Sequence, residues 1–204
     1  MGGSRSHWDN VYAAKAETAV SWFQPHSTRS LELIEQASPD GGASVVDVGG
    51  GASTLVDDLI GRGFIDLTVL DIAELALERS KARLGKQADK VTWIAADVTS
   101  WTPPRIWQIW HDRAVFHFLT ERPQQDTYVA ALTAATRPGA TAIFATFALD
   151  GTDKCSGLPV QRYSAETLAS RLGPAFALAG QANETHKTPA GSEQRFSFAV
   201  LRRQ

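Results

Sequence analysis

The sequence predicts an α/β fold in which a mostly parallel sheet of seven strands carries helices on both faces. Three observations support this prediction: strand-like and helical patterns alternate from residue 44 to residue 147, several strand runs stop at Gly or Asp, and two strand-like runs close the chain. Strands that are joined through a helix pair in parallel, because the crossover is long. The last two runs are joined by a short turn, which predicts an antiparallel hairpin.

The elements follow one another in a regular order. Strands are expected at residues 44–48, 67–71, 91–96, 106–110 and 141–147, where β-branched and aromatic residues gather. Helices are expected at residues 53–60, 74–84, 122–136 and 165–172, the first two of which stop at Gly. Strands at residues 176–182 and 195–201 form the hairpin, and helical patterns at residues 8–16 and 28–36 precede the first strand.

Composition is that of an ordinary soluble globular protein. Of the 204 residues, 43% are hydrophobic and 21% charged, and 20 Lys and Arg against 22 Asp and Glu give a net charge of -2. There is no basic block, so nucleic-acid binding is disfavoured. No apolar run is long enough to cross a bilayer, and the single Cys155 forms no internal disulfide, so no membrane contact and a cytoplasmic location are expected.

One domain over residues 1–204 is expected, with residues 1–40 as an N-terminal helical cover and residues 41–204 as the core. Gly2 and Ser6 fit a loose lipidation pattern, which a flexible tail explains more simply.

Three acidic residues stand at the ends of the first three predicted strands. Asp47 is followed by three glycines at residues 49–51, Asp71 ends the second strand, and Asp97 follows the third. Open α/β sheets bind ligands at the carboxyl ends of their strands. Glycines let the backbone approach a ligand closely, and Asp71 lies about 20 residues further on, where a carboxylate can bind a ribose diol. Asp97 is placed to accept a hydrogen bond from an adenine amino group.

Two cofactors suit this arrangement, and the loop favours the one without phosphates. A dinucleotide loop of the form Gly-x-Gly-x-x-Gly would have Thr54 at its last position, and Asp47 would stand close to the pyrophosphate. S-adenosylmethionine (SAM) offers a cationic amine, a ribose and an adenine. We therefore predict SAM as the cofactor, and an NAD-dependent oxidoreductase remains the weaker alternative.

Together these residues resemble the class I SAM-dependent methyltransferases. The pattern is Asp47-x-Gly49-x-Gly51, then Asp71 and Asp97, with a closing hairpin, and the resemblance covers about residues 40–204. It implies a Rossmann-like sheet in the order third, second, first, fourth, fifth, seventh, sixth, within a single SAM-binding domain. It also implies cofactor contacts from Asp47, Gly49, Gly50, Gly51, Ser53, Asp71, Ile72, Asp97 and Val98. Ser53 stands where the family often has a third Gly, and serine is a good helix cap, so binding should persist.

The methyl acceptor is expected at the end of the fourth strand. There Asp112-Arg113-Ala114 is similar to the Asp-Arg-Gly-Ala-Leu segment of the thiopurine S-methyltransferases. This predicts a small-molecule acceptor, a thiol, a thiopurine-like heterocycle or a chalcogen. Arg113 is the candidate for stabilising the acceptor's anion, Asp112 for orienting it or accepting a proton, and His117 for a general base. Alternatively, Asp112 and Arg113 pair with each other, and His117 is a core or surface residue.

The N-terminal segment leaves a second acceptor open. Residues 7–12 and 21–23 resemble small methyltransferases that include protein-lysine enzymes, so a protein-lysine N-methyltransferase is the alternative, and a SAM-binding module without catalysis is a third hypothesis. Trp22 and Phe23 are expected next to the substrate as a lid, or else as packing residues. Cys155 is a weak candidate for a catalytic thiol. No residue spacing matches a metal site, and a monomer or weak dimer is expected.

Overall fold

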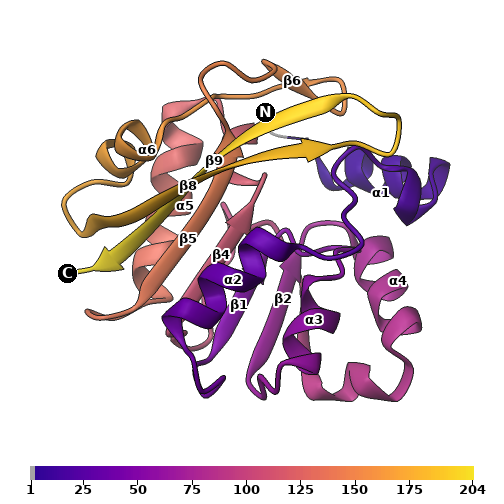
Figure 1. Ribbon diagram of the computed structural model, residues 1–204, viewed down its shortest axis with the longest axis horizontal. Helices are drawn as coiled ribbons and strands as arrows, with labels where there is room; N and C mark the ends of the chain where they lie inside the picture. Colours follow the sequence, from indigo (N-terminus) through magenta and orange to yellow (C-terminus); the bar gives the residue numbers. More distant parts are fainter. Residues whose placement is uncertain (1–2) are drawn as a thin grey trace.

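A seven-stranded sheet runs through the computed structural model, which describes residues 3–204 (Figure 1). Gly2 of the loose lipidation pattern lies outside these residues. The strand order is β3-β2-β1-β4-β5-β9-β8, where β1 to β5 pair in parallel and β9 pairs antiparallel with both β5 and β8. The strands are β1 (Val45–Val48), β2 (Leu67–Asp71), β3 (Val91–Ala95), β4 (Ile109–Arg113), β5 (Thr141–Phe147), β8 (Phe176–Lys187) and β9 (Glu193–Arg203). A separate small hairpin comprises β6 (Lys154–Cys155) and β7 (Leu158–Pro159). The predicted order is confirmed.

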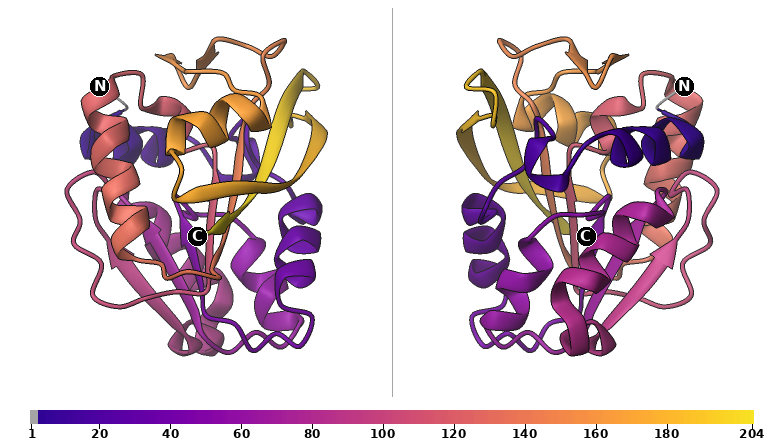
Figure 2. Two further views of the ribbon diagram at one scale, coloured as in Figure 1. Left: turned by 90° about the vertical axis from the view of Figure 1, so that its left-hand side faces the viewer. Right: turned by 90° about the vertical axis from the view of Figure 1, so that its right-hand side faces the viewer.

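Helices cover both faces of the sheet (Figure 2). One face packs against α2 (Thr28–Ala37), α3 (Leu55–Gly61) and α4 (Glu74–Leu84), and the other against α5 (Arg122–Ala134) and α6 (Ala165–Leu172). The remaining helix, α1 (Arg5–Ala14), contacts α4. Short 3-10 turns occupy Glu17–Ala19, Gly85–Lys90 and Phe116–Phe118. Among residues 3–204, none of the helices is long and apolar enough to cross a membrane.

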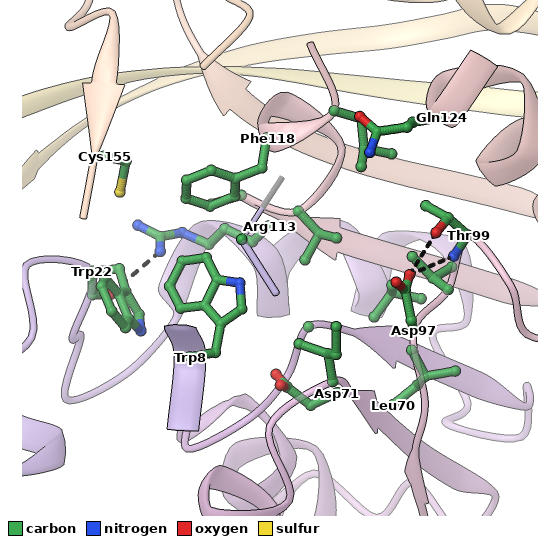
Figure 3. Close-up of a pocket in the computed structure, with 18 of the residues that line it drawn as sticks. Trp8, Trp22, Leu70, Asp71, Asp97, Thr99, Arg113, Phe118, Gln124 and Cys155 are labelled. Carbon is green, nitrogen blue, oxygen red and sulfur yellow. Dashed lines mark hydrogen bonds between the residues drawn. The ribbon is translucent and has the colours of Figure 1, made fainter. Parts of the chain in front are cut away.

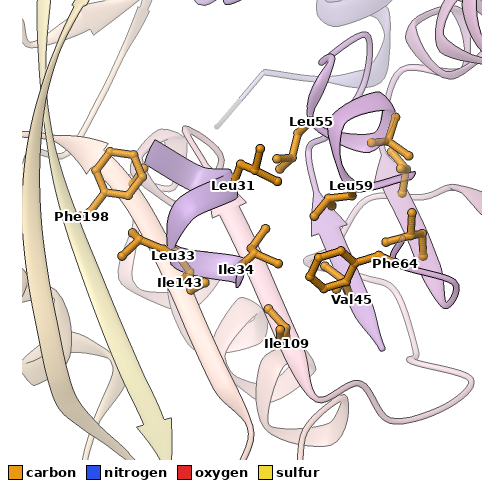
Figure 4. Packing of buried hydrophobic residues seen from close by; sticks show 14 of the residues in the cluster. Leu31, Leu33, Ile34, Val45, Leu55, Leu59, Phe64, Ile109, Ile143 and Phe198 are labelled. Atoms are coloured by element: carbon orange, nitrogen blue, oxygen red, sulfur yellow. The ribbon is translucent and has the colours of Figure 1, made fainter. Parts of the chain in front are cut away.

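Two apolar layers arise from the alternation of side chains along the central strands. Val45 of β1 and Ile143 of β5 pack on the side of α2 and α3 (Figure 4). Their neighbours Val46 and Phe144 pack on the opposite side, against residues of α5 and α6. A sheet buried on both faces needs apolar residues at consecutive positions, which explains the unbroken β-branched runs in the sequence.

The fourth strand differs from its prediction. It was expected at residues 106–110 but spans Ile109–Arg113, so His111 and Asp112 lie inside the strand and not beyond its tip. Both side chains are buried and polar, and each finds a partner on another element. A buried polar group needs such a partner. Because these partners are distant in sequence, the local pattern predicts an end of the strand that is too early. The hairpin is also longer than predicted, since β8 continues to Lys187.

Candidate functional site

A cavity opens where the carboxyl ends of the parallel strands meet α1 (Figure 3). Its empty volume is about 990 Å³, including the open solvent at its mouth. We call it the main cavity. Its acidic end is formed by Asp71, Ile72, Asp97 and Val98, and its arginine end by Trp22, Arg113, Cys155 and Phe196.

The acidic end presents two carboxylates from neighbouring strand ends. Asp71, the last residue of β2, is buried, and its Oδ1 accepts a hydrogen bond of 2.7 Å from the backbone N of Ala73. Burial raises the pKa of Asp71 to about 7, and the nearby charges of Asp47 and Asp9 add to this effect. Asp97 is exposed, and its Oδ1 accepts hydrogen bonds from the Thr99 backbone N at 2.9 Å and Oγ1 at 2.7 Å. Both carboxylates are positioned by the turns that follow their strands.

The glycine loop lies tightly against its surroundings. Gly49 and Gly51 have φ of 71° and 42°, a conformation that costs other residues about 1–2 kcal/mol. A Cβ at Gly49 would lie 2.0 Å from Cγ2 of Val115, and a Cβ at Gly51 would lie 2.7 Å from Oδ2 of Asp71 and 3.0 Å from the Tyr12 hydroxyl. Both the backbone conformation and the neighbouring protein atoms therefore require glycine at these two positions.

A second cavity lies on the other side of this loop and has about 520 Å³ of empty volume, again including solvent. Asp47, Gly50, Ser53 and Phe23 line it, and it shares Trp22, Gly49 and Arg113 with the main cavity. Oδ1 of Asp47 lies 2.7 Å from Nδ1 of His111, whose Nε2 lies 2.9 Å from Oγ of Ser30. Asp47 is therefore oriented by a buried chain of hydrogen bonds that reaches α2.

Asp112 holds the turn after β4 and lines neither cavity. It is fully buried, and it accepts hydrogen bonds from the backbone N of Val115 at 2.9 Å, from the backbone N of Phe116 at 3.0 Å, and from the Tyr128 hydroxyl. Burial raises its pKa to about 6, although these hydrogen bonds act in the opposite direction. The turn includes Ala114, whose φ of 69° is strained for a residue with a side chain. Asp112 thus braces a strained turn.

His117 also lies outside both cavities. It is buried in the turn Phe116–Phe118, and its Nδ1 accepts a hydrogen bond of 3.4 Å from the backbone N of Phe147. Burial, and to a lesser degree the charge of Arg113, lowers the pKa of His117 to about 3. The ring is therefore neutral at physiological pH.

Arg113 points into the arginine end, away from Asp71 and Asp97 (Figure 3). Successive strand residues face opposite sides of a sheet, so Arg113 and Asp112 do not pair with each other. Cζ of Arg113 lies 4.3 Å from the centre of the Phe196 ring, and its Nη1 donates to the Trp22 carbonyl at 3.4 Å. Its Nε and Nη2 are buried, and neither finds a hydrogen-bond partner among residues 3–204. Burial lowers the pKa of this guanidinium.

The predicted lid is divided between the two cavities. Trp22 lines both, whereas Phe23 lines only the second. Cys155 is buried at the arginine end, where burial raises the pKa of its thiol. Sequence reasoning missed Trp8, Tyr12, Phe118, Gln124, Phe147, Gln194 and Phe196, all of which line the main cavity. Trp8 and Tyr12 had a signal in the N-terminal resemblance, and Phe118 and Phe147 lie in segments after the fourth and fifth strands that are similar to the thiopurine S-methyltransferases. Within residues 3–204, no group of three or more His, Cys, Asp and Glu could hold a metal ion.

Residues 45–139 match the family described as a methyltransferase domain. The eEF1A lysine and N-terminal methyltransferase of Mus musculus is 25% identical over 97 residues, which are 48% of this chain and 14% of that protein. Methyltransferase srdJ of Neurospora crassa is 33% identical over 100 residues, which are 47% of this chain and 42% of that protein. The chain thus spans less than half the length of these curated relatives.

Comparison with solved structures shows the same fold over nearly the whole chain. The N-methyltransferase NodS from Bradyrhizobium japonicum WM9, in complex with S-adenosyl-L-homocysteine, has a TM-score of 0.74 at 16% identity and covers 98% of this chain and 99% of its own. The 1,6-didemethyltoxoflavin-N1-methyltransferase of Burkholderia thailandensis has a TM-score of 0.69 at 17% identity, covering 98% and 84%. The predicted Rossmann-like fold is confirmed, and these matches support a SAM-dependent methyltransferase. The local resemblance to thiopurine S-methyltransferases stays a prediction.

Proposed function

We propose that this chain transfers a methyl group from SAM to a small-molecule nucleophile, namely a thiol, a thiopurine-like heterocycle or a chalcogen. One observation carries the proposal: a single cavity joins the carboxylates of Asp71 and Asp97 to a buried, aromatic-lined arginine end. The acidic end would take the cofactor, and the arginine end would take a compact acceptor.

The acidic end and the glycine loop would hold the cofactor. The Asp71 carboxylate would accept hydrogen bonds from the two ribose hydroxyls, and Asp97 from the adenine amino group, between the apolar side chains of Ile72 and Val98. Asp47 and Gly49 would face the amino acid end, since both line the second cavity. The cofactor supplies an electrophilic methyl group on a sulfonium sulfur.

At the arginine end, the chain's task is to position the acceptor and exclude water. A lone pair of the acceptor forms the new bond to the methyl carbon while the carbon–sulfur bond breaks, its electron pair stays on sulfur, and the acceptor's proton passes to solvent. Neither Asp112 nor His117 lines the cavity, so the site favours an acceptor that loses its proton without a general base. A thiol next to the Arg113 cation is such an acceptor, because a nearby cation favours the thiolate.

A protein-lysine acceptor is the second candidate, and the similarity to the eEF1A lysine and N-terminal methyltransferase favours it. The charge of Arg113 argues against it, because a lysine side chain would have to enter a cavity that already holds a buried cation. Incubating the protein with a cell lysate and methyl-labelled SAM tests this candidate directly. A labelled protein band that persists in the presence of competing small thiols would replace the small-molecule proposal.

The first experiment is a calorimetric titration with S-adenosylhomocysteine beside NADH. Saturable binding of S-adenosylhomocysteine alone is expected, and Asp71→Ala should weaken it, because the ribose hydroxyls lose their acceptor. Asp89→Ala is the matched control, since Asp89 is exposed and lines neither cavity. Methylation of a panel of simple and heterocyclic thiols and selenite then follows by mass spectrometry. Binding of NADH alone, or no turnover on any of these acceptors, would contradict the proposal.

A further inference from the structure

The two unpartnered nitrogens of Arg113 lie on the same edge of its guanidinium. Nη1, on the other edge, donates to the Trp22 carbonyl, whereas Nε and Nη2 are buried without a hydrogen-bond partner among the described residues. The Nε–H and the adjacent Nη2–H point in parallel, which is the geometry in which arginine binds both oxygens of one carboxylate. The face of the guanidinium is already covered, because Phe196 stacks on it at 4.3 Å. Its unpaired edge is thus a two-donor fork.

A buried cation without a counter-ion is costly, and the chain supplies none nearby. None of the ion pairs within 4.0 Å among residues 3–204 involves Arg113, and Glu184 and Asp47 act on it only at longer range. Arg83 shows what a satisfied arginine looks like in this fold: it donates to Asp57 at 2.8 Å, to Glu17 at 3.0 Å and to two backbone carbonyls. A ligand with an anionic group would supply the partner that Arg113 lacks.

We propose that Arg113 binds a carboxylate carried by the methyl acceptor, so that the acceptor is a small carboxylic acid with a flat apolar body. This inference rests on the proposed function and narrows its substrate class. The rings of Trp8, Phe118, Phe147 and Phe196 line the main cavity and offer apolar surface to such a body. The carboxylate would fix the acceptor's orientation, which is what an in-line displacement requires of the protein.

The cofactor also carries a carboxylate, and Arg113 lines the second cavity as well, beside Asp47 and Gly49, which would face the cofactor's amino acid end. The direction of the guanidinium favours the acceptor's carboxylate. The guanidinium is directed towards Trp22 and Cys155, at the end of the cavity away from Asp71 and Asp97 (Figure 3). Phe196, which stacks on it, belongs to the C-terminal hairpin and not to the strand ends that would hold the cofactor. The experiment separates the two sources.

The test measures binding to the complex with S-adenosylhomocysteine by calorimetry. The probes are benzoate, 2-mercaptobenzoate and 2-naphthoate, each beside its uncharged amide. We expect at least one acid to bind about 10- to 100-fold more tightly than its amide, as paired hydrogen bonds to a charged group provide. Arg113→Gln should remove this preference, and Arg113→Lys should restore only part of it, because lysine keeps the charge without the fork.

Two controls make the result specific. Arg137→Gln removes an exposed arginine that lines neither cavity and should leave the preference unchanged. Affinity for S-adenosylhomocysteine itself should be unchanged in Arg113→Gln, with thermal unfolding showing that the variant is folded.

Three results would overturn the proposal or separate it from the proposed function. Equal binding of every acid and its amide, or no binding of any acid, overturns it. Loss of S-adenosylhomocysteine binding in Arg113→Gln, with 5′-methylthioadenosine still bound, assigns the fork to the cofactor's carboxylate and also overturns it. Failure of the unaltered protein to bind S-adenosylhomocysteine instead contradicts the proposed function. The acids are then titrated into the free protein, where binding that depends on Arg113 would still support a carboxylate site.

Discussion

The two ends of the main cavity are assembled in different ways. At the acidic end, Asp71 and Asp97 follow neighbouring strands, and each is held by backbone groups two residues away. At the arginine end, Arg113 contacts the Trp22 carbonyl, 91 residues earlier in the chain, and the Phe196 ring of the C-terminal hairpin. Local turns therefore build the first end, and long-range packing builds the second.

The two ends of the main cavity also differ in whether their polar groups have hydrogen-bond partners within the chain. The carboxylates of Asp71 and Asp97 already accept hydrogen bonds from their own turns, so this end is ordered before any ligand arrives. Arg113 keeps two buried donors without a partner in the described chain. We infer that the acidic end is structurally complete, whereas the arginine end is completed by its ligand. The following predictions test that difference.

The largest effect is expected at Asp112, which supports the arginine end from the opposite face of β4. Asp112→Ala should lower the free energy of unfolding by about 3–5 kcal/mol, because two backbone N–H groups and the Tyr128 hydroxyl would lose a buried charged acceptor. Urea denaturation measures this. Asp112→Asn is the matched variant and should cost less, since its amide oxygen still accepts a hydrogen bond. A loss below about 1 kcal/mol in Asp112→Ala would mean that the turn does not depend on this brace.

Next comes Gly49, where the acidic end meets the turn after β4. Gly49→Ala should cost about 2–4 kcal/mol of stability, the sum of a left-handed backbone and an overlap with Val115, whose Cγ2 would lie 2.0 Å from the new Cβ. Gly63→Ala isolates the first part, because Gly63 has a φ of 87° but no atom within 4 Å of its added Cβ.

The double variant Gly49→Ala/Val115→Ala lacks the overlapping methyl group. Its loss of stability should therefore fall from that of Gly49→Ala to that of Gly63→Ala. Denaturation of the three variants, with S-adenosylhomocysteine affinity measured on each, checks the prediction. Equal costs for Gly49→Ala and Gly63→Ala would show that the loop has room to move away from Val115.

A smaller effect is expected from the pH dependence of the acidic end. With its pKa raised to about 7, Asp71 is mostly protonated at pH 6 and ionised at pH 8, and only the carboxylate can accept from both ribose hydroxyls. Affinity for S-adenosylhomocysteine should therefore rise about tenfold between these values. The effect of pH on the stability of the fold has the opposite direction. The raised pKa of Asp71 stabilises the folded state in full below about pH 4, and this contribution is lost as the pH rises through about 7. Calorimetry across this range checks the first trend, and Asp71→Asn should abolish it.

The sequence predicts the parts of the molecule that depend on local structure better than the parts that depend on long-range contacts. The glycine loop, Asp71 and Asp97 depend on short segments, and the structure has them at adjacent strand ends with the predicted sheet order. The fourth strand was predicted at the wrong position, because His111 and Asp112 are buried and their partners lie on β1 and α5. No local sequence pattern reveals such partners. The same shift explains why Asp112 and Arg113, adjacent in sequence, face opposite sides of the sheet.

The smallest effect separates the arginine end from an ordinary structural arginine. Arg113→Met should raise the free energy of unfolding by about 1 kcal/mol, because it replaces a buried, partly unpaired cation by an apolar side chain among aromatic rings. Arg83→Met should instead lower it by about 1–3 kcal/mol, because Asp57, Glu17 and the carbonyls of the glycine loop lose their donor. Urea denaturation of both variants without ligand measures the two signs. If Arg113→Met stabilises the protein and Arg83→Met destabilises it, Arg113 itself destabilises the free protein. Its place in the chain is then explained by what it binds. A loss of stability in both variants would make Arg113 part of the scaffold, and the arginine end would then be as complete without a ligand as the acidic end.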